Sequence, residues 1–179
     1  MQNILKIAMV AGALGLAAQA KAVEYSITFS GSVFSANGQI DVSGGVADSG
    51  YLTVAGGPDS GTYSLVALGS PLINGDVTPS YSTLRAPSGD QIFDDVVYVG
   101  SNPFLTGNGL EFANSDLIGF NLWGNGPGYY SLFASSRNVY VIDGGNATLT
   151  AVVPDGGLTA GLLGGALLGL GALRRKLQV

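Results

Sequence analysis

The chain has 179 residues with a hydrophobic fraction of 46%, a formal net charge of −5, and neither cysteine nor histidine. Disulfides are therefore excluded, as are the commonest general base and every Ser-His or Cys-His nucleophile. Between residues 23 and 153 the only basic side chains are Arg85 and Arg137, which leaves no electrostatic surface for nucleic acid.

The N-terminus has the features of a secretory signal peptide over residues 1–22. Lys6 precedes an uncharged apolar run, and Ala20-Lys21-Ala22 fits the small-x-small pattern for cleavage before Val23. Cleavage after Ala20 is the alternative. The apolar run is shorter than the roughly 20 residues of a membrane span, so we expect a removed signal rather than an anchor.

Residues 23–153 are predicted to form a single ectodomain made of β-strands. The segment EYSITFSGSVFS at 24–35 alternates apolar and polar residues, which is the period of a half-buried strand. Further short strands, separated by Gly, Asn, Asp and Pro, are predicted at 51–56, 61–69, 90–100, 109–114, 116–124, 128–135, 138–143 and 146–153. We expect an antiparallel β-sandwich, either jelly-roll-like or a flattened barrel.

The stretch LWGNGPGYY at 122–130 is the best candidate for a binding surface. Trp123, Tyr129 and Tyr130 flank a glycine-rich loop, and exposed rings beside amides suit stacking on sugar faces. The alternative, which we favour, is that Trp123 packs in the core at a strand end and that the loop is only a hairpin.

The carboxylates do not form a recognisable catalytic pattern. Asp94 and Asp95 are adjacent, so on a strand they would point to opposite faces and would belong to a turn or a solvated face. A glycosidase needs two carboxylates that converge across a cleft. The sequence leaves open whether Asp90, Asp94, Glu111 and Asp116 converge.

We therefore expect no catalytic residue, no metal site and no cofactor. The Asp- and Gly-rich segment at 41–50 could hold Ca²⁺ through oxygen ligands. It lacks the DxDxDG spacing, however, and turn chemistry explains its composition equally well.

The C-terminal segment, residues 154–179, differs from the body. Residues 157–173 are uncharged and rich in Leu, Ala and Gly, and as a helix they would be just long enough to span the hydrocarbon core. Arg174, Arg175 and Lys176 follow as a basic foot, which the positive-inside tendency places in the cytoplasm.

The sequence VPDGG at 153–157, followed by this apolar segment and basic foot, resembles the PEP-CTERM class of sorting signals. It is most similar to the VPDSG-CTERM variety of Gram-negative bacteria that make extracellular polysaccharide. The chain departs from that variety at Gly156, where the motif has Ser. The body resembles a β-rich ectodomain that often precedes such signals and has no assigned activity.

The resemblance implies an exported protein that pauses in the inner membrane with its body in the periplasm. An exosortase, which is a polytopic membrane transpeptidase, would then cut near the motif and pass the body to the cell surface or extracellular matrix. In this interpretation the motif serves as substrate recognition, through Val153, Pro154, Asp155, Gly156 and Gly157. The body would be a structural or interaction protein. The alternatives are a carbohydrate-binding module that contacts exopolysaccharide and, less favoured, a secreted carboxylate-dependent hydrolase.

Overall fold

The computed structural model describes residues 22–57, 59–86, 89–135 and 140–152. It contains ten strands: β1 (Val23–Gly31), β2 (Ser35–Ser43), β3 (Val46–Ala55), β4 (Gly61–Leu65), β5 (Ser82–Ala86), β6 (Gly89–Phe93), β7 (Leu110–Ala113), β8 (Gly119–Gly124), β9 (Tyr130–Ser135) and β10 (Tyr140–Ala151). The predicted signal-peptide core and C-terminal helix lie outside the described residues. Within those residues, no helix is long and apolar enough to cross a membrane.

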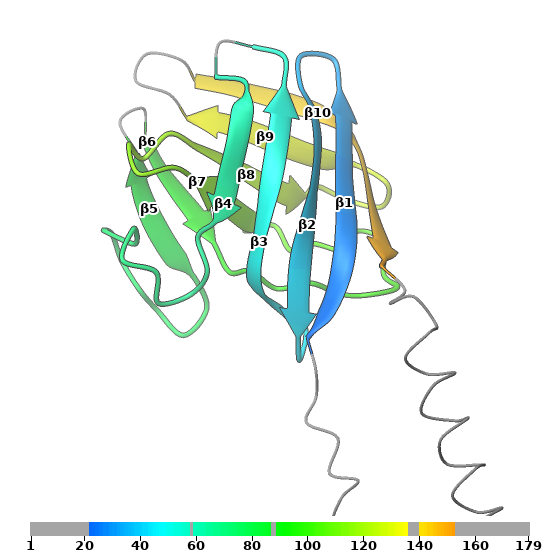
Figure 1. Cartoon of the computed structure of the whole chain (residues 1–179), viewed down its shortest axis with the longest axis horizontal. Coiled ribbons are helices and arrows are strands. Elements are labelled where there is room, and N and C mark those ends of the chain that lie inside the picture. The colour runs from blue at the N-terminus through cyan, green and yellow to red at the C-terminus, as the bar shows by residue number, and fades with distance from the viewer. Residues whose placement is uncertain (1–21, 58, 87–88, 136–139, 153–179) are drawn as a thin grey trace, which may run out of the picture.

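Eight strands close into an antiparallel barrel in the order β1-β10-β9-β8-β7-β4-β3-β2, and β5 pairs with β6 in a separate small sheet. Figure 1 shows β1–β4 as a front layer and β7–β10 as a layer behind it. Rings from both layers meet in the core, where the Phe120 centroid lies 4.8 Å from that of Tyr63. The all-β antiparallel prediction is confirmed in its flattened-barrel form. The jelly-roll-like form is wrong, because most barrel neighbours are consecutive along the chain.

Strand β10 joins the two layers at one side of the barrel. Its first half, from Tyr140, pairs with β9, and its second half, from Gly145 to Ala151, pairs with β1. A side chain at Gly145 would overlap the carbonyl oxygen of Ser30, so glycine is needed where the strand changes partner. The described parts of the two short strands predicted at 138–143 and 146–153 therefore belong to one continuous strand.

The opposite seam, between β4 and β7, is short. It consists of the pairs Ser64↔Ala113 and Leu65↔Phe112, extended by a hydrogen bond of 2.8 Å from the Val66 amide to the Glu111 carbonyl. Between these strands the chain forms the β5–β6 hairpin. A small apolar cluster of Val66, Leu84, Phe93 and Ala113 packs the hairpin against the outer face of β7.

Two strands were missed by the sequence pattern, β2 and β5. In β2 the inward positions begin with Ala36 and Gly38, which carry too little apolar surface to reveal the alternation. A side chain at Gly38 would overlap the backbone of Tyr51 and Leu52 on β3, so the position requires close backbone approach rather than apolar bulk.

The carboxylate of Asp143, on β10, holds the loop between β1 and β2. It accepts hydrogen bonds from the backbone amides of Ser32, Val33 and Phe34 and from the Ser32 hydroxyl, at 2.8 to 3.1 Å. Burial disfavours the ionised form, but the bonds from Phe34, Val33 and Ser32 outweigh it and lower the pKa of Asp143 below its usual value.

We predict that Asp143→Asn lowers the free energy of unfolding at neutral pH by about 2 kcal/mol, because charge-assisted bonds to three amides are weakened. A lowered carboxyl pKa gives stability that is fully present above the unfolded pKa of about 3.9 and is lost as pH falls through the folded pKa. The difference from the unmodified chain should therefore shrink below about pH 4. Urea unfolding followed by Trp123 fluorescence measures it.

Asp41→Asn is the matched control, because the Asp41 carboxylate accepts one bond, from the exposed Ser49 hydroxyl. We expect that control to change stability by less than about 0.5 kcal/mol. A difference between Asp143→Asn and the unmodified chain that stays constant from pH 7 to pH 3 would contradict the assigned role.

Candidate functional site

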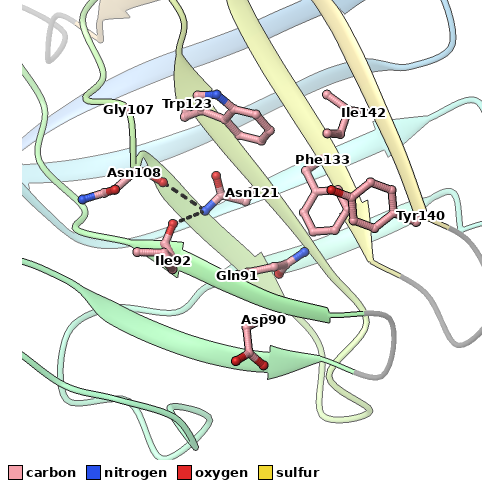
Figure 2. A pocket seen from close by; sticks show the side chains of 10 residues that line it. All are labelled: Asp90, Gln91, Ile92, Gly107, Asn108, Asn121, Trp123, Phe133, Tyr140 and Ile142. Carbon is pink, nitrogen blue, oxygen red and sulfur yellow. Dashed lines mark hydrogen bonds between the residues drawn. The ribbon is translucent and has the colours of Figure 1, made fainter.

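A groove of about 330 Å³ lies on the outer face of the β8–β9–β10 layer, beside β6. Figure 2 shows its two sides, one formed by β6 with the turn at 107–108, and the other by β9 and β10. The lining residues are Asp90, Gln91, Ile92, Gly107, Asn108, Asn121, Trp123, Phe133, Tyr140 and Ile142.

Strand register places the groove side chains together. Asn121 on β8 pairs with Phe133 on β9, and Phe133 pairs with Ile142 on β10. Since alternate residues of a strand share a face, the three form one row across the outer surface. Their strand neighbours Leu122 and Leu132 point into the barrel and are fully buried.

The apolar side of the groove is open to solvent. Tyr140 is 65% exposed and Ile142 is 51% exposed, whereas Phe133 beneath them is 7% exposed. The rings of Phe133 and Tyr140 lie 4.7 Å apart at an interplanar angle of 56°. Trp123, which is partly exposed, stands at the other end of the groove. Exposed aromatic rings that are supported from below are suited to contact a ligand.

The polar side is fixed by hydrogen bonds. The Asn121 side-chain nitrogen donates to the carbonyl oxygens of Ile92 and Asn108, both at 3.1 Å, as the dashed lines in Figure 2 show. These bonds connect β8 to β6 and to the 107–108 turn, so the width of the groove is set by protein contacts.

Asp94 organises that turn. Its carboxylate accepts bonds from the Thr106 hydroxyl at 2.7 and 2.8 Å, and from the Asn108 side-chain nitrogen at 3.3 Å. The Thr106 hydroxyl oxygen in turn accepts from the Gly109 amide at 3.0 Å. Asp94 itself directly follows β6 and does not lie in a turn, but its carboxylate holds the turn that Thr106 and Asn108 form.

Asp95 is a different case, because its side chain is fully buried. Within the described residues, neither carboxylate oxygen has a hydrogen-bond partner. Burial, followed by the neighbouring charge of Asp94, raises the pKa of Asp95 to about 8, although the nearby amides of Glu111 and Leu68 oppose this. The turn or solvated face predicted for Asp95 is wrong, because its side chain is enclosed near the backbone of Glu111 and Leu68.

Glu111, on β7, is also fully buried. The Gln91 amide is assigned with its nitrogen toward Glu111, where it donates to both carboxylate oxygens. Burial raises the pKa of Glu111 well above its usual value; the Asn121 amide lowers it, and Asp95 adds to the rise. The charge of Asp95 thus acts on Glu111 inside the protein, where both side chains are fully buried.

The aromatic residues singled out from the sequence occupy three different environments. Trp123 lines the groove, so its interpretation as a core residue is wrong. Tyr130 is 2% exposed, and its hydroxyl accepts a bond of 2.9 Å from the Phe104 amide, so it is a core residue. Tyr129 is 50% exposed and lies over Gly144 on the same layer, outside the groove lining. The glycine-rich loop between Trp123 and Tyr129 connects β8 to β9 as a hairpin, as expected.

The groove also contains three residues that the sequence analysis did not identify as site residues, Phe133, Tyr140 and Asn121. Each lies in a predicted strand, but only the pairing of β8, β9 and β10 brings them to one surface. Among the described residues, no group of three or more acidic side chains is arranged to hold a metal ion.

The barrel ends where the C-terminal motif begins. Ala151, the last residue of β10, pairs with Tyr25, and the Val152 amide donates to the Glu24 carbonyl at 2.9 Å. The sorting residues 153–157 and the basic foot 174–176 lie outside the described part of the chain.

A family model for the VPDSG-CTERM motif matches residues 152–177. The chain therefore carries a VPDSG-CTERM sorting signal, which is the mark of a secreted protein whose C-terminus is directed to an exosortase. No curated protein matches the chain, and no solved structure does so either.

We predict that Asp95→Asn stabilises the protein increasingly as pH rises. A carboxyl pKa raised to about 8 means that the folded state keeps a proton that the unfolded chain releases above about pH 4, so stability falls between these values. The amide does not titrate, so its advantage should grow with pH to the order of 5 kcal/mol near pH 8, since each of about four pKa units corresponds to about 1.4 kcal/mol. Urea unfolding from pH 5 to pH 8.5 measures it.

Asp48→Asn, at an exposed position of β3, controls for the loss of one negative charge. We expect that control to follow the unmodified chain at every pH. An Asp95→Asn chain whose stability relative to the unmodified protein does not change with pH would show that Asp95 titrates normally.

Proposed function

We propose that this chain is a surface or matrix protein whose barrel is released outside the inner membrane by exosortase-type processing. The precursor would be held in the membrane by residues 157–173, with the barrel in the periplasm and residues 174–176 in the cytoplasm. The observation that carries the proposal is the match to the sorting signal at residues 152–177.

The position of the signal relative to the barrel supports this order of events. The match begins at Val152, the residue whose amide still bonds to Glu24 of β1. The motif thus follows directly on the closed barrel, and a cut between residues 153 and 156 would leave the barrel strands whole. β1 starts at Val23, so removal of the predicted signal peptide would also leave the first strand complete.

In this proposal the barrel acts by contact and not by catalysis. Two of its acids, Asp95 and Glu111, are enclosed, and Asp94 is committed to a turn. Of the groove-lining residues that the structure describes, only Asp90 carries a carboxylate, whereas a carboxylate-dependent glycosidase needs a converging pair. The barrel's proposed partner is the extracellular polysaccharide implied by the resemblance of its signal.

The C-terminal mass of the protein from its native cells tests the proposal. We expect a chain that ends between Val153 and Gly156, with or without an added group, in the surface or extracellular fraction. An intact chain that ends at Val179 and remains in the membrane fraction would overturn the proposal.

We further predict that Pro154→Ala or Asp155→Ala in the motif causes the full-length chain to accumulate, because the transpeptidase reads an extended backbone with a fixed proline φ angle. Immunoblotting of membrane and extracellular fractions measures the ratio of precursor to product. Asp48→Ala, in the barrel, is the control and should be processed normally. Normal processing of both motif variants would show that the enzyme does not read this motif.

A further inference from the structure

We propose that the groove between β6 and the β8–β9–β10 layer is a binding site for an uncharged glycan. This inference deepens the proposed surface role, because it rests on the barrel lying outside the cell, and it names the site and the ligand class. The combination that carries it is exposed aromatic faces, fixed amides and the absence of a basic side chain among the described lining residues.

The aromatic side chains provide surfaces for sugar rings. A pyranose with equatorial hydroxyls has C–H groups on its faces, and such faces pack on aromatic rings. Tyr140 is 65% exposed, and its ring is supported by Phe133 at 4.7 Å. Trp123 lies at the far end of the same groove (Figure 2). A short glycan lying along the groove therefore meets an aromatic face near each end.

The amides provide directional contacts for hydroxyl groups. Because the Asn121 side-chain nitrogen donates to Ile92 and Asn108, its orientation is fixed. Figure 2 shows its carbonyl oxygen directed away from those bonds and into the groove. This oxygen accepts a hydrogen bond from a sugar hydroxyl. An amide that is already held in place loses little conformational entropy when a ligand binds.

Charge selects against anionic ligands. Among the described residues that line the groove, Asp90 is the only charged one. The nearest described base is Arg85 on β5, which lies 4.0 Å from Asp90 and 3.8 Å from Asp76, with more than half of each side chain exposed. A uronic acid in the groove would meet the Asp90 carboxylate, and the part of the lining that the structure describes offers no cation to compensate it. An uncharged sugar is not repelled by the Asp90 carboxylate.

The size of the groove sets the length of the bound segment. A volume of about 330 Å³ is at the lower end of the range of roughly 300–1,000 Å³ for small-molecule sites. The groove is open along one side to solvent, as the exposure of Tyr140 and Ile142 shows. It therefore accommodates about two sugar rings of a longer chain that continues into solvent.

Isothermal titration of the full chain in a mild detergent tests the inference. The probes are three neutral oligosaccharides, cellohexaose, laminarihexaose and mannohexaose, and one anionic oligogalacturonate of similar length. We expect at least one neutral probe to bind and the oligogalacturonate to bind at least tenfold more weakly. Trp123→Ala and Tyr140→Ala should each weaken neutral binding about tenfold, through the loss of one stacked ring.

Tyr51→Ala is the matched control, because Tyr51 is an exposed tyrosine on β3 in the opposite layer, 40% exposed. It should bind as the unmodified chain does, and circular dichroism should show that all three variants are folded. The inference is overturned if no neutral probe binds, if the oligogalacturonate binds best, or if Trp123→Ala and Tyr140→Ala leave binding unchanged.

These outcomes are separable from those of the proposed function. A chain that is processed at its C-terminus but binds no neutral probe would contradict the glycan inference and leave the sorting proposal intact. A chain that binds a neutral probe through Trp123 but keeps residues 157–179 in its native cells would contradict the sorting proposal and leave the glycan inference intact.

Discussion

The structure depends on the double pairing of β10. Its first half pairs with β9 and its second half with β1, so one strand holds the two layers together at that side. This strand carries the groove residues Tyr140 and Ile142, the loop-holding Asp143 and Ala151, which pairs with Tyr25. A shift of β10 by one residue would turn Ile142 inward and Asp143 outward, and would remove the groove and the loop contact together.

A second feature of the structure is the layer of buried polar side chains that connects β6 to β7 and β8. Gln91 reaches from β6 to Glu111, and Asn121 reaches from β8 to the Ile92 carbonyl. Both amides also line the groove, so the groove surface is held from behind by the buried Glu111 carboxylate and by backbone carbonyls. Because Asp95 has a pKa raised to about 8, this layer keeps at least one proton at neutral pH and needs no basic partner. The protein thus buries Asp95 and Glu111 without an ion pair to a basic side chain in the part of the chain that the structure describes.

The barrel and the sorting signal meet without a spacer. The last barrel hydrogen bond, from Val152 to Glu24, is made by the first residue of the matched motif. The first strand, β1, begins at Val23 and pairs with β10. The chain therefore enters and leaves the barrel on neighbouring strands at the same end, as Figure 1 shows. The groove lies on the β8–β9–β10 layer, where Tyr140 stands at the start of β10 and the motif follows its end. A ligand and a processing enzyme would therefore contact different parts of the barrel.

The sequence by itself determined the strand character of the body, the lack of histidine and cysteine chemistry, and the sorting signal, because period-two alternation, composition and a contiguous motif are local properties. It placed Trp123 in a candidate binding stretch but could not separate Trp123 from Tyr130, since only strand pairing shows which face is covered. The tertiary structure alone decided that β10 is one strand through Gly144 and Gly145, and that Asp95 is buried. It also brought Phe133 and Tyr140 to the groove. These outcomes depend on contacts between residues far apart in the chain, and no local pattern encodes such contacts.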